Sequence, residues 1–263
     1  MDSLFAAFPV TPGLFAAALA ITLAAAALQG TIGVGFSVVS VPLLVLIDRR
    51  LAPVPQLLMA VPLVLLMALR ERRAIDAKSV VRASIGRVPG AALGAVLLSV
   101  ASAETLDFAV ALIVILSAGL IGGGVRLRRR PSTEVGAGFL SGVTGVVASM
   151  GGPPVALLFV GERPSVVRAN LAAIYSVGVF VSVGARVAAD AITWTDVTMA
   201  LWLMPGLFGG LLVSRFFVRR VNAASVARAV LIVCVLAGCA LVVRAAGGIS
   251  PPQSTTSHDR SGG

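Results

Sequence analysis

Two glycine-rich stretches contain the residues best suited to bind a ligand. Residues 30–44 read GTIGVGFSVVSVPLL, and residues 138–158 read GFLSGVTGVVASMGGPPVALL. Glycine lets a ligand approach a backbone N–H closely, because no Cβ intervenes. Backbone N–H groups at an interrupted helix, together with helix N-termini, can replace the water around an anion without adding net charge. The two stretches therefore predict a binding site for a small anion.

The predicted site combines glycines, hydroxyls and prolines of both stretches with two polar residues that follow the second. Its substrate-binding candidates are Gly33, Gly35, Ser37, Pro42, Gly145, Ser149, Gly151, Gly152, Pro153, Arg168 and Asn170. Arg168 could attract an anion at a pore mouth, although an arginine at a helix end more often extends to the membrane interface. Ser141 and Thr144 could add hydroxyls, but helix packing is their favoured interpretation, as it is for Tyr175. Packing is also the alternative interpretation of the glycines.

An internal repeat relates the two stretches. Gly30 and Gly142, Gly33 and Gly145, and Pro42 and Pro154 are each separated by 112 positions. Further along, Gly90 and Gly206 are separated by 116 positions, and each follows a proline. Interrupted apolar segments at corresponding positions of two halves are the best sequence indication of a transport site.

Composition predicts an all-α polytopic membrane protein whose surroundings are the lipid bilayer. The chain is 58% hydrophobic and 12% charged, with a mean hydropathy of +1.01. Several apolar runs exceed the roughly 18 residues that indicate a membrane span. The net charge of +10 could suggest nucleic acid. We exclude that partner, because the arginines form short clusters between apolar runs, as topology signals do.

The uneven lengths of the apolar segments argue against eight simple crossings. They fall at about 13–47, 53–69, 83–101, 106–125, 135–160, 166–185, 196–214 and 224–246. The first would measure about 52 Å as one helix, against a hydrocarbon core of about 30 Å. It must therefore break, and Gly30, Gly33 and Gly35 are the obvious place. Eight spans nevertheless remain the alternative to six spans with two re-entrant hairpins.

Charge distribution predicts that the two halves are inverted. Basic loops at 70–87, 126–130 and 215–228 are expected in the cytoplasm, and the acidic loops near Glu104 and Asp190 outside. Corresponding loops of the two halves carry opposite bias, as an inverted repeat requires. Each half would then be a broken or re-entrant segment followed by three transmembrane helices. The predicted organisation is a first repeat at 1–125, a basic linker at 126–134, a second repeat at 135–246 and a polar tail at 247–263.

The distribution of reactive residues argues against an enzyme, a metal or another cofactor. All eleven acidic residues lie in loops, in termini or at segment edges, whereas cation-coupled carriers often use a buried carboxylate. This favours an anion path, although sodium could still bind backbone carbonyls at the breaks. Cys234 and Cys239 have no metal-binding spacing, and His258 has no catalytic partner nearby. An anion channel, an intramembrane enzyme and a structural membrane protein remain the alternative classes.

With both motifs in place, the sequence resembles the TauE/SafE family of membrane transporters, the sulfite exporter family. The resemblance rests on the two glycine-rich stretches and on RANLAAIYSVGVFVSVGARV from Arg168, and it covers the chain except its tail. It implies a multi-pass carrier of the bacterial inner membrane that usually exports small sulfur-containing or organic anions. We also allow for a homo-oligomer. The family's commoner first motif has glycines where this chain has Phe36 and Ser37. That departure leaves the exact substrate open, and the sequence does not indicate the transport direction or the coupling ion.

Overall fold

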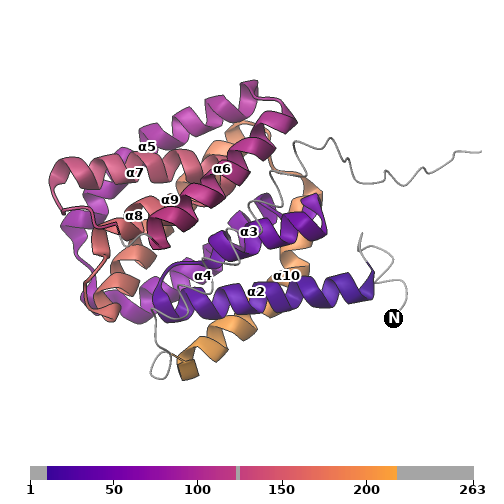
Figure 1. The fold of residues 1–263 in the computed structure, drawn as a ribbon, viewed down its shortest axis with the longest axis horizontal. Helices are drawn as coiled ribbons and strands as arrows, with labels where there is room; N and C mark the ends of the chain where they lie inside the picture. The colour runs from indigo at the N-terminus through magenta and orange to yellow at the C-terminus, as the bar shows by residue number, and fades with distance from the viewer. Residues whose placement is uncertain (1–10, 123–124, 218–263) are drawn as a thin grey trace, which may run out of the picture.

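The computed structural model describes residues 11–122 and 125–217, and every regular element within these ranges is a helix (Figure 1). Five helical spans there are long and apolar enough to cross a membrane: Pro12–Ile32, Arg49–Ala74, Ala77–Val100, Pro164–Ala188 and Trp194–Phe216. The prediction of an all-α polytopic membrane protein is therefore confirmed. The predicted segment at 224–246, the tail, Cys234, Cys239 and His258 lie outside the described residues.

The helices follow the predicted apolar segments closely. The first half contains α2 (Pro12–Ile32), α3 (Phe36–Ile47), η1 (Arg49–Leu51), α4 (Val54–Glu71), η2 (Arg72–Ala74), α5 (Ala77–Val100) and α6 (Ala103–Gly122). The second half contains α7 (Pro131–Ala148), α8 (Gly152–Ala156), η3 (Leu157–Phe159), α9 (Pro164–Ala188) and α10 (Trp194–Phe217).

Both glycine-rich stretches interrupt their helices. We call residues 33–35 the first break and residues 149–151 the second break. Gly33 and Gly35 have φ values of 97° and 127°, which favour glycine, and Ser149 ends α7 with a φ of 56°. Gly30 was also expected at the first break, but it lies within α2 and packs against Ser214 of α10.

Two helix pairs flank a central pair. Helix α5 packs along α7, α10 packs along α2, and α4 packs against α9 between them (Figure 1). A Cβ on Gly86 or Gly90 would overlap the backbone of α7, and one on Gly210 would overlap the backbone of α2. Helices in lipid associate through such close backbone contacts, because lipid supplies no hydrophobic force between them. These three glycines, which lie outside the two glycine-rich stretches, therefore serve helix packing.

Apolar side chains on the outside of the bundle fit a lipid environment. On α5 alone, Val81, Ile85, Val88 and Val96 are exposed. Large exposed apolar surface is typical of a membrane or protein contact.

Charged groups gather at one end of the bundle. Arg129 forms ion pairs with Asp76 at 2.6 Å and with Glu162 at 3.7 Å, and Arg168 pairs with Glu71 at 2.9 Å. These contacts join the end of α4, the start of α5, the segment before α7 and the start of α9. Two of the three basic loops predicted for one membrane face, at 70–87 and 126–130, thus meet in the structure.

Candidate functional site

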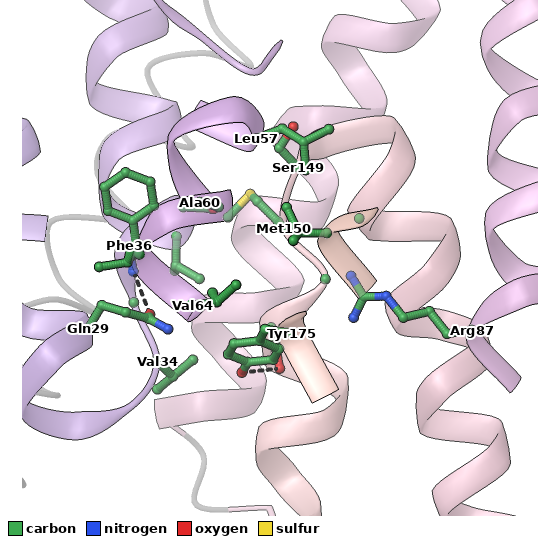
Figure 2. A pocket seen from close by; sticks show the side chains of 18 residues that line it. Gln29, Val34, Phe36, Leu57, Ala60, Val64, Arg87, Ser149, Met150 and Tyr175 are labelled. Carbon is green, nitrogen blue, oxygen red and sulfur yellow. Dashed lines mark hydrogen bonds between the residues drawn. The ribbon is translucent and has the colours of Figure 1, made fainter. Parts of the chain in front are cut away.

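The two breaks line a common cavity, although they are more than a hundred residues apart in the sequence (Figure 2). About 60 Å³ of its interior can be reached by the centre of a water molecule. The lining also includes residues of α2, α3, α4, α5, α7 and α9. Six predicted site residues are among those that line it: Gly35, Ser37, Gly145, Ser149, Gly151 and Gly152.

The other five predicted residues do not line this cavity. Gly33 makes the turn at the end of α2, where its N–H donates to Gln29 O at 2.8 Å. Pro42 lies within α3, and Pro153 lies in the first turn of α8; both are buried. Their role in binding stays a prediction.

Arg168 and Asn170 make contacts that join helices. Besides its ion pair with Glu71, Arg168 donates from Nη1 to Thr31 O at 3.4 Å. Asn170 Oδ1 accepts from the Asp76 N–H at 2.7 Å, and its Nδ2 donates to Ala74 O at 3.3 Å. These bonds hold the start of α9 against the α4–α5 connection. Binding of an anion by either residue also stays a prediction.

Gln29 bridges the first break. Its Oε1 accepts from the Phe36 N–H at 3.0 Å, and its Nε2 donates to Gly33 O at 3.1 Å. The first free N–H of α3 is therefore occupied by a side chain. Sequence reasoning missed Gln29, although an amide four residues before Gly33 in an apolar helix was an available signal.

Ser141 and Tyr175 hold the second break. Ser141 Oγ donates to Gly151 O, and Tyr175 Oη donates to Gly152 O at 3.1 Å. Both residues were expected to serve mainly helix packing, but the structure places Ser141 in a hydrogen-bond network beside the cavity and Tyr175 on its wall. Thr144, in contrast, bonds to Leu140 O within its own helix.

Arg186 completes the end of α7. Its Nε donates to Val146 O at 2.7 Å, and its Nη2 donates to Val147 O at 2.9 Å. The last carbonyls of a helix have no partner within the helix, so a buried end needs such donors. The arginine makes the second break compatible with a buried position.

Among the described residues that line the cavity, Arg87 is the only charged one. The sequence assigned it to a basic loop at 70–87, and this assignment is wrong, because α5 begins at Ala77 and continues to Val100. Ten residues of helix correspond to about 15 Å, which is half of a bilayer core of about 30 Å. Arg87 is therefore near the middle of its span, where its residue is only 4% exposed.

The guanidinium of Arg87 has few partners among the described residues. Its Nη1 donates to Ser141 Oγ at 2.7 Å, and its Nε has no hydrogen-bond partner there. Ser149 Oγ, which also lines the cavity, is likewise buried without a partner. Burying a cation costs several kcal/mol unless charges or hydrogen bonds compensate for the lost water. The cavity therefore presents an incompletely satisfied positive charge.

Polar groups in this cavity suit an anion better than a metal ion. Arginine has five N–H donors and no acceptor, so it cannot coordinate a cation. Within the described residues, no group of three or more His, Cys, Asp or Glu side chains could hold a metal ion.

A comparison with known protein families identifies a match. The family model described as "Sulfite exporter TauE/SafE" matches residues 18–241, which is most of the chain. Neither the curated proteins nor the solved structures yield a match.

Proposed function

The chain belongs to the TauE/SafE sulfite exporter family, and we propose that it exports a small anion, sulfite or an organosulfur or organic acid, across the bacterial inner membrane. Membership of a transporter family and the apolar helices make it a multi-pass membrane transporter. The substrate, the direction and the binding site are the proposed part.

One observation carries the proposal: the two interrupted segments converge on one cavity. Transporters bind substrate where discontinuous helices meet, because irregular backbone is tolerated in a membrane only inside protein or beside a cavity. The lining includes Arg87 and Ser149, whose side chains can donate to an anion, and Gly151 and Gly152, which carry no side chain that would cover the backbone.

We further propose that the two halves are inverted repeats, and paired contacts support this. Gln29 and Ser141 are 112 positions apart, like Gly30 and Gly142, and each hydrogen-bonds across its own break. Arg70 and Arg186 are 116 positions apart, and each donates to carbonyls near the end of the helix before a break.

Helix directions fit the same proposal. The end of α4 meets the start of α9 at the Glu71–Arg168 pair, so these corresponding helices run in opposite directions. Arg70, at the end of α4, donates to Gly30 O near the end of α2, so these two helix ends lie together. The start of α4 lies at the opposite end, where η1, which ends at Leu51, contacts α10. Because α3 leads into η1, α3 would return toward the start of α2. This supports re-entrant hairpins rather than eight successive spans.

The test is flux in proteoliposomes loaded with labelled sulfite, sulfate, thiosulfate, sulfoacetate or acetate. We expect saturable flux of at least one anion in the wild type and its loss in Gly152→Leu, because the side chain would fill the space toward Tyr175 and Val34. Gly136→Leu is the matched control, since a Cβ there meets nothing within 4 Å.

Each outcome has a clear meaning. Equal flux in Gly152→Leu and the wild type, with both proteins folded, would show that the cavity is not the path. Non-saturating flux with single-channel currents would identify a pore instead of a carrier.

A further inference from the structure

We propose that Arg87 binds the transported anion directly, and that the cavity around it accepts only small oxyanions, of the size of sulfite or acetate. This inference rests on the proposed function and adds to it the residue that recognises the substrate and the size limit of the substrate class.

Arg87 differs from the other buried ionic side chains of the described residues. Arg168 is paired with Glu71, and the buried Glu134 is paired with Arg82 at 3.1 Å and accepts from Ser79 at 2.5 Å. Arg186 donates to two carbonyls. Arg87 has one hydrogen bond, to a neutral hydroxyl, and forms no ion pair with a described residue. An anion in the cavity would supply the missing charge.

Glycines leave the space that the Arg87 guanidinium occupies. A Cβ on Gly178 would overlap the Arg87 guanidinium, and one on Gly145 or Gly151 would lie 3.0 Å or 2.6 Å from its Nη2. Three glycines from α7, the second break and α9 thus surround one side chain. A fork of N–H donors fixed in this way matches the oxygens of an oxyanion, whereas lysine offers only a point charge.

Position and direction also favour a ligand at Arg87. Figure 2 shows the side chain extending into the cavity from α5, opposite Gln29 and Phe36. Ser141 links this group to the second break, because its Oγ accepts from Arg87 and donates to Gly151 O. Binding at the guanidinium is therefore connected to the backbone of the interrupted segment.

Cavity size limits the ligand. About 10–15 Å³ of such space is needed for one water molecule, so 60 Å³ corresponds to about four to six waters. Sulfite, sulfate and acetate have about that many non-hydrogen atoms. Sulfoacetate has about twice as many and would require the helices to separate.

The experiment measures anion binding to the purified full-length protein in nanodiscs by calorimetry, with flux measured in parallel. Arg87→Gln is expected to weaken sulfite or acetate binding by about thirtyfold or more, as the loss of a buried charged partner does. Arg87→Lys keeps the positive charge without the paired N–H donors, so its anion affinity should lie between those of the wild type and Arg87→Gln. Arg82→Gln is the matched control on α5, because Arg82 is partly exposed and does not line the cavity.

Several results would overturn the inference. Saturable wild-type flux with unchanged affinity in Arg87→Gln would refute the role of Arg87 and leave the proposed function intact. Absence of wild-type flux for every anion would refute the proposed function and the inference together. If Arg87→Gln does not fold, Arg87→Lys and the wild type still decide. Unchanged affinity in Arg87→Lys would refute recognition of the anion by the paired N–H donors of the guanidinium. Sulfoacetate binding as tight as that of sulfite would refute the size limit.

Discussion

Replacing Gly178 with alanine is expected to weaken anion binding while leaving the fold nearly as stable as the wild type. The added Cβ would overlap the Arg87 guanidinium, so that side chain must leave its position. It then loses the 2.7 Å hydrogen bond to Ser141 Oγ, and a bond of this charged type contributes about 1.5–3 kcal/mol. If the same free energy is lost from anion binding, affinity falls roughly tenfold to 150-fold.

The same substitution has an opposing effect on stability. Alanine favours a helix by up to about 1 kcal/mol relative to glycine, which offsets part of the lost bond. Thermal unfolding in detergent should therefore change by only a few degrees, while calorimetry shows the lower affinity. Gly184→Ala is the control on the same helix, because its Cβ meets nothing within 4 Å. For Gly184→Ala we expect the anion affinity of the wild type and a melting temperature that is equal or higher. Wild-type affinity in a folded Gly178→Ala protein would refute the assigned position of the guanidinium.

Three further predictions concern contacts around the cavity and at the charged end of the bundle. Gln29→Leu leaves the Phe36 N–H and Gly33 O without their partner, so we expect a loss of about 1–3 kcal/mol per buried group and a lower melting temperature. A double-mutant cycle on Glu71 and Arg168 should give a coupling free energy of about 0.5–3 kcal/mol, and additive effects would contradict this. Asp76 is expected to stabilise the fold only above acidic pH. Desolvation raises the pKa of its carboxyl, but hydrogen bonds and the charge of Arg129 outweigh it and lower the pKa below its ordinary value of 3.8. Its contribution is then present above about pH 4 and lost as pH falls through the lowered pKa, so the stability difference from Asp76→Asn should disappear in acid.

Local chemistry made the positions of the breaks predictable. Residues at 33–35 and 149–151 combine glycines with nearby prolines, and these residue types oppose a continuous helix wherever they occur. Six cavity-lining residues could be identified for that reason. The inverted repeat and the re-entrant hairpins remain predictions.

Arg87 and Gln29 were missed for a different reason, because their roles depend on position in three dimensions. Asp76 caps α5 by accepting from the Lys78 and Ser79 N–H groups, and this start carries Arg87 ten residues into the span. In the sequence, Arg87 follows a cluster of basic residues and was counted with them. Gln29 is a single amide in an apolar helix, and its partners are known only once the chain turns at residues 33–35.

The arginine in the cavity has no counterpart in the other half. Leu203, which follows Arg87 by 116 positions, is fully buried and uncharged. With a monovalent anion bound, the site is electrically neutral, whereas the empty site carries one positive charge. The membrane potential acts on a moving charge with about 2.3 kcal/mol per 100 mV for a full crossing. If Arg87 binds a monovalent anion and shifts along the membrane normal, the return of the empty carrier is therefore the voltage-sensitive step; with a divalent anion the loaded step would also carry a net charge.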